Sequence, residues 1–205
     1  VYGHNDMGEL EAVLAANKDA KRKLIITDGV FSMDGDIAPL DEIDKLAKEH
    51  GAMVYVDDCH GEGVLGETGA GIVDHFGLQG SIDFETGSFS KALGVQGGIL
   101  AGTEMTRTHA LNHSRSWLLS GSQPPGVAAA QKAAVEVLME EPQHHQKLWQ
   151  NTDYFRSELQ SMGFDTGVST TPIIPVMCGE SSVAKDFTVE LSKDCLLYTS
   201  PSPRD

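Results

Sequence analysis

The sequence predicts an α/β fold in which a mostly parallel sheet has helices on both of its faces. Helix and strand patterns alternate along the first half of the chain, which is typical of strand–helix–strand units. The strand patterns are short and almost continuously apolar, as expected of strands that are covered on both faces. Ligands bind at the carboxyl ends of the strands in such sheets, so polar residues at those ends are the first candidates for a site.

The first half of the chain contains the strands of this predicted sheet. A helix is expected directly after Asp6. Residues 40–50 form an amphipathic pattern with Leu40, Ile43, Leu46 and Ala47 on one face. Residues 31–39 are rich in turn-forming residues and predict a loop. The elements expected here are helices over residues 7–15, 40–50 and 72–76, and strands over residues 23–30, 52–56, 82–86 and 97–101.

The second half is predominantly helical and contains a predicted domain boundary. The elements expected here are helices over residues 104–116, 125–139 and 142–162, a strand over residues 171–177, and a helix that begins near Ser182. We place a large domain at residues 1–150 and the truncated start of a small C-terminal α+β domain at residues 151–194.

Residues 195–205 do not continue the preceding helical pattern. Their sequence, CLLYTSPSPRD, resembles the translation of an adapter used in preparing sequencing libraries. We therefore expect this segment to be read-through rather than native sequence, and we leave it out of the fold prediction. The start at Val1 also enters in the middle of a fold, so we expect the chain to be truncated at both ends.

Charge and composition exclude several classes of partner. The 205 residues carry a formal net charge of −15, whereas nucleic acids and anionic membranes require clustered basic residues. No apolar run approaches the roughly 20 residues that span a bilayer, and no signal-peptide pattern is present. The 3 cysteines lack the spacing of a zinc site or a disulfide framework. We therefore expect a cytoplasmic protein without a metal site.

An acid, a histidine and a lysine follow two of the predicted strands. The strand over residues 52–56 leads into Asp57, Asp58 and His60, and the strand over residues 82–86 leads to Lys91. A lysine can form an imine with a carbonyl cofactor, and a carboxylate can keep the ring nitrogen of that cofactor protonated. The combination predicts a site for pyridoxal phosphate (PLP), although each residue taken alone is more often structural or solvent-exposed.

Three features near these residues leave alternatives open. Asp57 and Asp58 point to opposite faces if the strand continues, and spacing alone does not decide which one faces the cofactor. Residues 61–66 match G-x-G-x-x-G after a strand, but the glycines that follow break the long helix that a dinucleotide fold needs. The loop with Ser120 and Ser122 enters a predicted helix, where it can bind an anion or simply cap the helix.

Four motifs together carry a family resemblance. They are DGVFSMDGDIAP at residues 28–39, VDDCHG at 56–61, GETGAG at 66–71 and SFSKALG at 88–94. Taken together, these motifs resemble those of the α-oxoamine synthases, which are PLP enzymes of the aspartate-aminotransferase fold. The resemblance extends over residues 1–194 and implies the large domain of a fold-type I PLP-dependent transferase. Cys59 and Ala70 stand where other residues are commoner in the family.

The resemblance implies a role for each candidate residue at the cofactor ring. Lys91 would hold the cofactor as an imine, and Asp57, the first acid of the pair, would bind the pyridine nitrogen. His60 and Ser32 would lie near the phenolic oxygen. Lys91, Asp57 and His60 are the residues that the resemblance makes catalytic.

The resemblance also implies a phosphate site and a second subunit. Ser88 would bind the cofactor phosphate, as its glycine-rich surroundings also suggest. Ser120 and Ser122 match a loop that reaches the phosphate of the neighbouring subunit, so a homodimer with an active site at the interface is implied. A ring-stacking histidine upstream and a carboxylate-binding arginine downstream are missing from this chain, so we expect the isolated fragment to be inactive.

Within the family, the sequence resembles enzymes that join an amino acid to an acyl-CoA and release free CoA. Residues 73–79 and the Gly97-Gly98 pair favour glycine and acetyl-CoA as substrates, as in glycine C-acetyltransferase. The alternatives are 8-amino-7-oxononanoate synthase, which uses alanine and a pimeloyl thioester in the biotin pathway, and a serine palmitoyltransferase-like enzyme. Transamination on the same fold and a non-catalytic scaffold with a degenerate site are the remaining alternatives.

Overall fold

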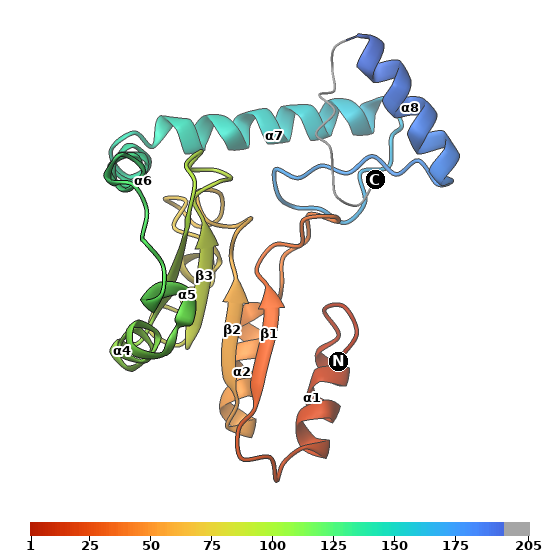
Figure 1. The fold of residues 1–205 in the computed structure, drawn as a ribbon. Helices are drawn as coiled ribbons and strands as arrows, with labels where there is room; N and C mark the ends of the chain where they lie inside the picture. The colour runs from red at the N-terminus through yellow and green to blue at the C-terminus, as the bar shows by residue number, and fades with distance from the viewer. Residues whose placement is uncertain (195–205) are drawn as a thin grey trace.

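The computed structural model describes residues 1–194, in which four strands form one mixed sheet (Figure 1). The strands are β1 (Leu24–Asp28), β2 (Met53–Asp57), β3 (Phe84–Ser88) and β4 (Gly98–Gly102). Their order is β1-β2-β3-β4; the first three strands are parallel, and β4 is antiparallel to β3. The mostly parallel sheet predicted from the sequence is confirmed. The segment expected to be adapter read-through, residues 195–205, lies outside the described residues.

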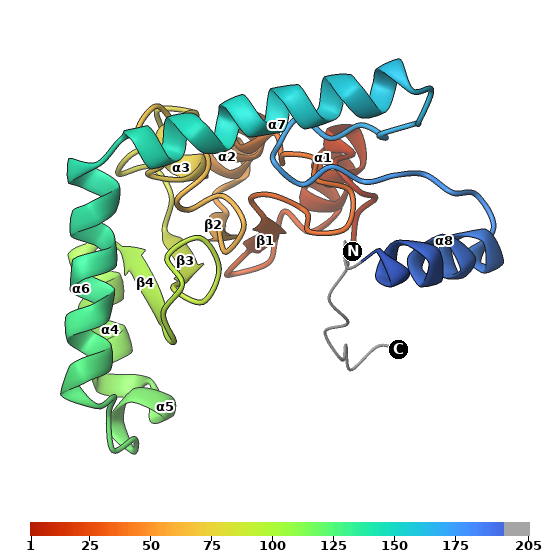
Figure 2. The ribbon, with the colours of Figure 1, turned by 90° about the horizontal axis from the view of Figure 1, so that it is seen from above.

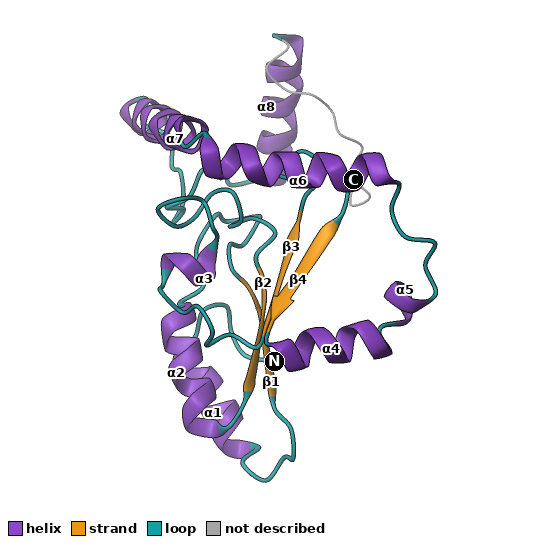
Figure 3. Cartoon of the chain, turned by 90° about the vertical axis from the view of Figure 1, so that its left-hand side faces the viewer, coloured by secondary structure: helices purple, strands orange, loops and turns teal. Residues whose placement is uncertain are grey.

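Helices lie on both sides of this sheet. They are α1 (Met7–Ala16), α2 (Leu40–His50), α3 (Ile72–His75), α4 (Glu104–His113), α5 (Arg115–Leu118), α6 (Pro125–Glu140), α7 (Gln143–Ser161) and α8 (Ser181–Lys193). Figure 3 shows α1, α2 and α3 on one side of the sheet and α4 on the other, and Figure 1 shows α7 crossing above the strand ends. No helix within residues 1–194 is both long enough and apolar enough to cross a membrane.

The amphipathic pattern of α2 explains why this helix forms where it does. Leu40, Ile43 and Ala47 are 0–2% exposed and pack into the core. Gly51 then ends the helix in a left-handed conformation with φ of 59°, and its N–H donates to the Ala47 carbonyl. The observed bounds of α2 coincide with the predicted ones.

Buried and more exposed side chains alternate along β1 and β2, so the sheet has one packed face and one open face. Ile25, Val54 and Val56 are at most 4% exposed and pack against the helices of the core. Leu24 and Ile26, which point the other way, are 47% and 63% exposed. A residue that lies two positions after Ile26 along the strand therefore also lies on the open face of the sheet.

The helix predicted over residues 104–116 is divided in two. Ser114 adopts an extended conformation, with φ of −74° and ψ of 109°, and it separates α4 from α5. Serine favours helix boundaries over helix interiors because its hydroxyl competes for backbone hydrogen bonds. The continuous helix was therefore the wrong prediction for this segment.

The strand predicted over residues 171–177 is also wrong. The segment has no regular secondary structure, because Pro172 and Pro175 cannot donate to a ladder. Side-chain hydrogen bonds fix it instead: the hydroxyls of Ser169 and Thr171 donate to the Gly35 carbonyl at 3.1 and 2.8 Å. The proposed boundary at residue 150 lies inside α7 (Figure 2), and the domain division remains a prediction.

We predict that Ile43→Ala lowers the free energy of unfolding by about 2–5 kcal/mol, because it leaves a cavity in a fully packed site. The control is Leu119→Ala, which truncates a side chain that is 83% exposed and should cost less than about 0.5 kcal/mol. Urea unfolding of both variants measures the difference. Equal losses would contradict the assigned core.

Candidate active site

Three parallel strands bring their carboxyl ends to one edge of the sheet. Asp28 at the end of β1 pairs in register with Asp57 at the end of β2, and Asp57 pairs with Thr86 in β3. The Gly29 N–H donates to the Asp57 carbonyl at 2.7 Å, so the pairing continues beyond the strands themselves. Both side chains lie on the open face of the sheet, where a ligand can reach their carboxylates.

The two adjacent acids have different surroundings. Asp58 is 1% exposed, and its Oδ2 accepts a hydrogen bond from the Ile72 N–H at 2.9 Å, at the start of α3. A Cβ at Gly61 or Gly71 would overlap its carboxylate, so both positions require glycine. Asp57 is only half-buried, and its Oδ1 accepts a hydrogen bond from the Cys59 N–H at 3.0 Å. Of the pair, Asp57 is therefore the acid available at the open edge.

Burial controls the ionisation of Asp58. Desolvation raises the pKa of this carboxyl to about 7, the hydrogen bond from Ile72 opposes the rise, and the charges of Glu85, Glu62 and Asp57 add to it. Asp58 is thus a structural acid that holds its proton over much of the acidic range.

His60 lies within electrostatic range of both Asp57 and Lys91. Lys91 lies in the β3–β4 connection, which is closed by hydrogen bonds from the Phe89 N–H to Gly97 at 3.0 Å and from the Val95 N–H to Phe89 at 2.7 Å. Burial lowers the pKa of His60 and the charge of Lys91 lowers it further, whereas Asp57 and Asp28 raise it. The structure thus brings the three predicted catalytic residues within electrostatic range of one another.

The predicted hydroxyl ligands are divided between two places. Ser88 ends β3, and its Oγ lies 2.6 Å from the Oγ of Ser90. Ser32 is exposed in the loop that follows β1. The connection between α5 and α6 carries Ser120 and Ser122, and Figure 2 shows it well away from the ends of β1 and β2. Their predicted role in a neighbouring subunit therefore remains a prediction.

The donor set at this edge fits PLP. Asp57 offers a carboxylate for a ring nitrogen, Lys91 an amine for a carbonyl, His60 an imidazole for a phenolic oxygen and Ser88 a hydroxyl for a phosphate. The open face beside them presents the apolar side chain of Ile26, which suits an aromatic ring. A dinucleotide site fits less well, since residues 61–66 form turns and lead only to the four-residue helix α3.

Sequence reasoning assigned no role to Asp28, although the structure places it in the site. Burial and the charge of Asp57 raise the pKa of Asp28, whereas His60 and Lys91 lower it, so all four groups interact. The missed signal was available, because Asp28 closes an apolar strand in the same way that Asp57 does. Glu62 was missed as well: its Oε1 is buried without a hydrogen-bond partner in residues 1–194, and no motif indicated this.

We predict that Asp58→Asn weakens the dependence of stability on pH. The folded-state pKa of Asp58 is raised, so its contribution to stability is fully present below about pH 4 and is lost as the pH rises through about 7. Asparagine cannot titrate, so the variant should gain on the parent by an amount on the order of a few kcal/mol between pH 4 and 8. Urea unfolding across this range measures the gain.

The matched control for this prediction is Asp153→Asn, which makes the same replacement on the exposed surface of α7. It should unfold with the pH profile of the parent. An Asp58→Asn profile that runs parallel to both would contradict a buried carboxyl that titrates near neutrality.

Comparisons with known proteins agree with this fold. Residues 2–204 match the family described as aminotransferase class I and II. The chain is 53% identical over 203 residues to an 8-amino-7-oxononanoate synthase of Fervidobacterium nodosum, covering 98% of this chain and 51% of the relative. An enzyme of the same description from Bacillus subtilis is 48% identical over 191 residues, covering 93% of this chain and 49% of the relative.

A solved structure shares this fold. A serine palmitoyltransferase from S. paucimobilis, with a bound PLP–myriocin aldimine, is 34% identical and superimposes with a TM-score of 0.82, covering 88% of this chain and 47% of that protein. The chain spans about half the length of the curated relatives it matches.

The comparisons favour a different enzyme within the family from the one that the sequence favoured. Relatives at 48–53% identity are named 8-amino-7-oxononanoate synthases, so the resemblance to glycine C-acetyltransferase is not supported over this alternative. The family itself is shown by the match over residues 2–204, by these relatives and by the fold. The chain therefore belongs to the aminotransferase class I and II family, in its α-oxoamine synthase branch.

Proposed function

We propose that this chain is part of a PLP-dependent α-oxoamine synthase that condenses alanine with a pimeloyl thioester and releases the free thiol. The observation that carries the proposal is the grouping of Asp57, His60 and Lys91 at the carboxyl edge of a parallel sheet. The choice of substrates is supported by the 53% identity to an 8-amino-7-oxononanoate synthase. Because the chain covers 51% of that relative, we assign the activity to the protein at the full length of its relatives.

PLP, when bound, supplies a carbonyl group that condenses with amines and a ring that withdraws electrons from the adjoining carbon. In our proposal the Lys91 Nζ would hold that carbonyl and would also be the group placed to carry a proton from the amino acid. The Asp57 carboxylate holds a proton on the ring nitrogen. Asp57 would thereby favour removal of a proton from the amino acid, since only a protonated ring would withdraw electrons effectively.

The remaining residues orient the cofactor. In our proposal the His60 imidazole donates a hydrogen bond to the phenolic oxygen, with the Ser32 hydroxyl nearby. The Ser88 hydroxyl, at the end of β3, would bind the phosphate. Ser120 and Ser122 bind the phosphate held by a second copy of the chain, because their loop lies away from the site of its own chain. A homodimer is therefore part of the proposal.

We predict that PLP becomes attached to Lys91. After incubation with PLP and reduction by borohydride, peptide mass spectrometry should find the pyridoxyl group on Lys91, and Lys91→Ala should abolish this adduct. Lys45→Ala removes an exposed lysine of α2 and should leave the adduct intact. An adduct spread evenly over surface lysines, in the parent and in Lys91→Ala alike, would contradict a specific cofactor site.

The substrate pair is tested on the protein expressed at the full length of its relatives. We predict that thiol release is fastest with alanine and a pimeloyl thioester, and that Lys91→Ala abolishes it. Asp57→Asn should lower kcat by at least about 100-fold, because the electron sink is lost while the binding groups remain. Faster release with glycine and acetyl-CoA would instead support the glycine C-acetyltransferase alternative.

A further inference from the structure

The turn over residues 61–63 has a fixed backbone from which Glu62 projects. The Glu62 N–H donates to the Asp58 carbonyl at 3.0 Å, and the Gly63 N–H donates to the Gly69 carbonyl at 2.7 Å. The Glu62 side chain is half-buried, and its Oε1 is buried without a hydrogen-bond partner within residues 1–194. A buried carboxylate oxygen is costly, so its place in the fold needs a physical reason.

The Glu62 carboxylate lies directly against Gly87 in β3. A Cβ at Gly87 would lie 2.7 Å from the Glu62 Cδ and closer still to its Oε2, so the carboxylate takes the space of a side chain. Thr86 pairs with Asp57 and shares its open face. Because side chains alternate along a strand, Gly87 faces the packed side and the Ser88 side chain faces the open side. Glu62 therefore supports the end of β3 from the face opposite the candidate phosphate ligand.

The same turn makes a second contact beyond the end of β3. Gly63 has a φ of 75°, and a Cβ there would lie 2.6 Å from the Ala92 Cβ, so the two backbones approach closely. Gly87 and Ala92 stand on either side of Ser88 and Lys91 in the sequence. The turn thus touches both ends of the segment that carries these two candidate cofactor ligands.

The groups around Glu62 connect its carboxylate to this segment. Burial raises the pKa of the Glu62 carboxyl, whereas the Ser88 N–H, as a hydrogen-bond donor, and the charge of Lys91 lower it; the charge of Asp57 raises it. A charged acceptor makes a stronger hydrogen bond than a neutral one. The ionised form of Glu62 is therefore the form that holds the Ser88 backbone most firmly.

Two further acids act on the packed side of β3. Glu85 pairs with Val56, and burial and the charge of Glu62 raise the pKa of Glu85. Asp58 interacts with both Glu62 and Glu85. Neither of these acids replaces Glu62, because it is the Glu62 carboxylate that lies against Gly87.

We propose that Glu62 is a positioning residue, which fixes the backbone at Gly87 and Ser88 and thereby sets where the Ser88 hydroxyl meets the cofactor phosphate. This inference rests on the proposed function for its effect on the cofactor. The contact between Glu62 and the end of β3 depends on the fold alone. The two parts can therefore be tested separately.

The contact is tested by a double-mutant cycle in urea unfolding of the 205-residue chain. Gly87→Ala should lower the unfolding midpoint, because the added methyl group overlaps the Glu62 carboxylate. In a Glu62→Ala background the same substitution should lower the midpoint much less, since the space is then free. In a Glu67→Ala background, which truncates an exposed acid of the same loop, Gly87→Ala should remain as costly as in the parent.

Equal effects of Gly87→Ala in all three backgrounds would overturn the proposal. Should Gly87→Ala fail to fold, adding Glu62→Ala should restore folding. A double variant that stays unfolded would count against the contact in the same way.

The link to Ser88 is tested by NMR of the chain labelled with 15N-serine, with Ser88→Ala used to assign the resonance. The Ser88 amide proton should shift with pH as Glu62 ionises, and Glu62→Gln should abolish this titration. The matched control is Glu85→Gln, which removes an acid from the same face of β3 and should leave the titration in place. A Ser88 signal that stays fixed in the parent, or that titrates equally in Glu62→Gln, would overturn the proposal.

The effect on the cofactor is tested on the protein at the full length of its relatives, by following the absorbance of the imine as PLP is added. Glu62→Ala should weaken PLP binding about tenfold, the equivalent of one lost hydrogen bond. Glu62→Gln should recover most of the affinity, because its amide oxygen can still accept from the Ser88 N–H. Glu67→Ala should bind PLP like the parent.

Unchanged PLP affinity in Glu62→Ala would overturn this part of the proposal. A parent that binds no PLP would reject the proposed function instead. The double-mutant cycle and the Ser88 titration would then still decide whether Glu62 holds the end of β3.

Discussion

The site depends on a buried carboxylate that does not take part in its chemistry. Asp58 connects three segments: its N–H donates to Thr86 in β3, its carboxylate accepts from Ile72 at the start of α3, and Gly61 and Gly71 pack directly against it. These contacts fold the chain back beneath the end of β2. A carboxylate so deeply buried is costly unless it is hydrogen-bonded or protonated, and burial raises the pKa of Asp58 to about 7. The result is a fixed exit from β2 that leaves Asp57 on the open side of the sheet.

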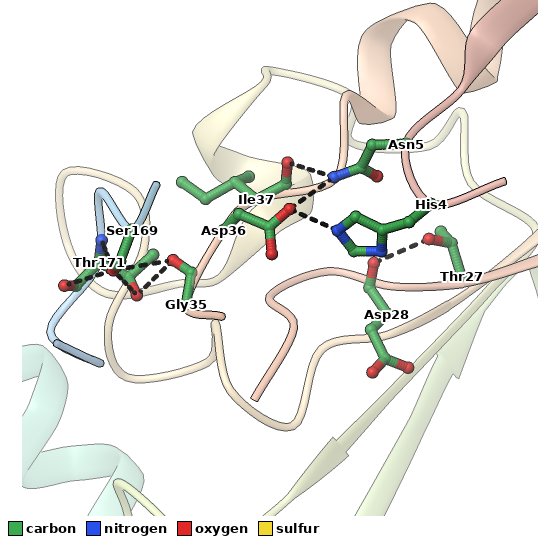
Figure 4. A network of polar contacts seen from close by, with 9 residues as sticks. All are labelled: His4, Asn5, Thr27, Asp28, Gly35, Asp36, Ile37, Ser169 and Thr171. Atoms are coloured by element: carbon green, nitrogen blue, oxygen red, sulfur yellow. Dashed lines mark hydrogen bonds and ion pairs between the residues drawn. The ribbon is translucent and has the colours of Figure 1, made fainter. Parts of the chain in front are cut away.

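A second set of contacts fixes the loop after β1 from two distant parts of the chain (Figure 4). The His4 imidazole lies 2.7 Å from the Asp36 carboxylate, to which the Asn5 amide donates at 2.8 Å. On the other side, Ser169 and Thr171 donate to the Gly35 carbonyl. The loop with Ser32 is thus held between the first residues of the chain and the segment after α7. Since Asp28 precedes this loop directly, the same contacts limit the movement of the β1 end.

The parts of the fold that could be predicted are those that local pattern determines. The spacing of Leu40, Ile43 and Ala47 gave the bounds of α2 because a single buried face decides this helix. The break at Ser114 and the irregular segment after Thr171 were mispredicted, because each depends on competition between backbone and side-chain hydrogen bonds. At the site, spacing could not distinguish Asp57 from Asp58, since the choice is made by Ile72, fourteen residues further on. The sequence also could not place Asp28 next to Asp57, because only the pairing of β1 with β2 brings these two residues together.

The charge balance at the edge of the sheet also limits how the site can bind anions. Asp28 and Asp57 act on the same group of residues as Lys91, and burial and Lys91 lower the pKa of His60, so the edge carries little net positive charge. The whole chain carries −15, so its long-range field repels anions rather than attracting them. A phosphate bound here must therefore be held mainly by directed dipoles, such as the Ser88 hydroxyl at the end of β3. Because dipoles act only at short range, the position of the β3 end, and hence its pairing with β2 through Thr86, decides whether such an anion can bind at all.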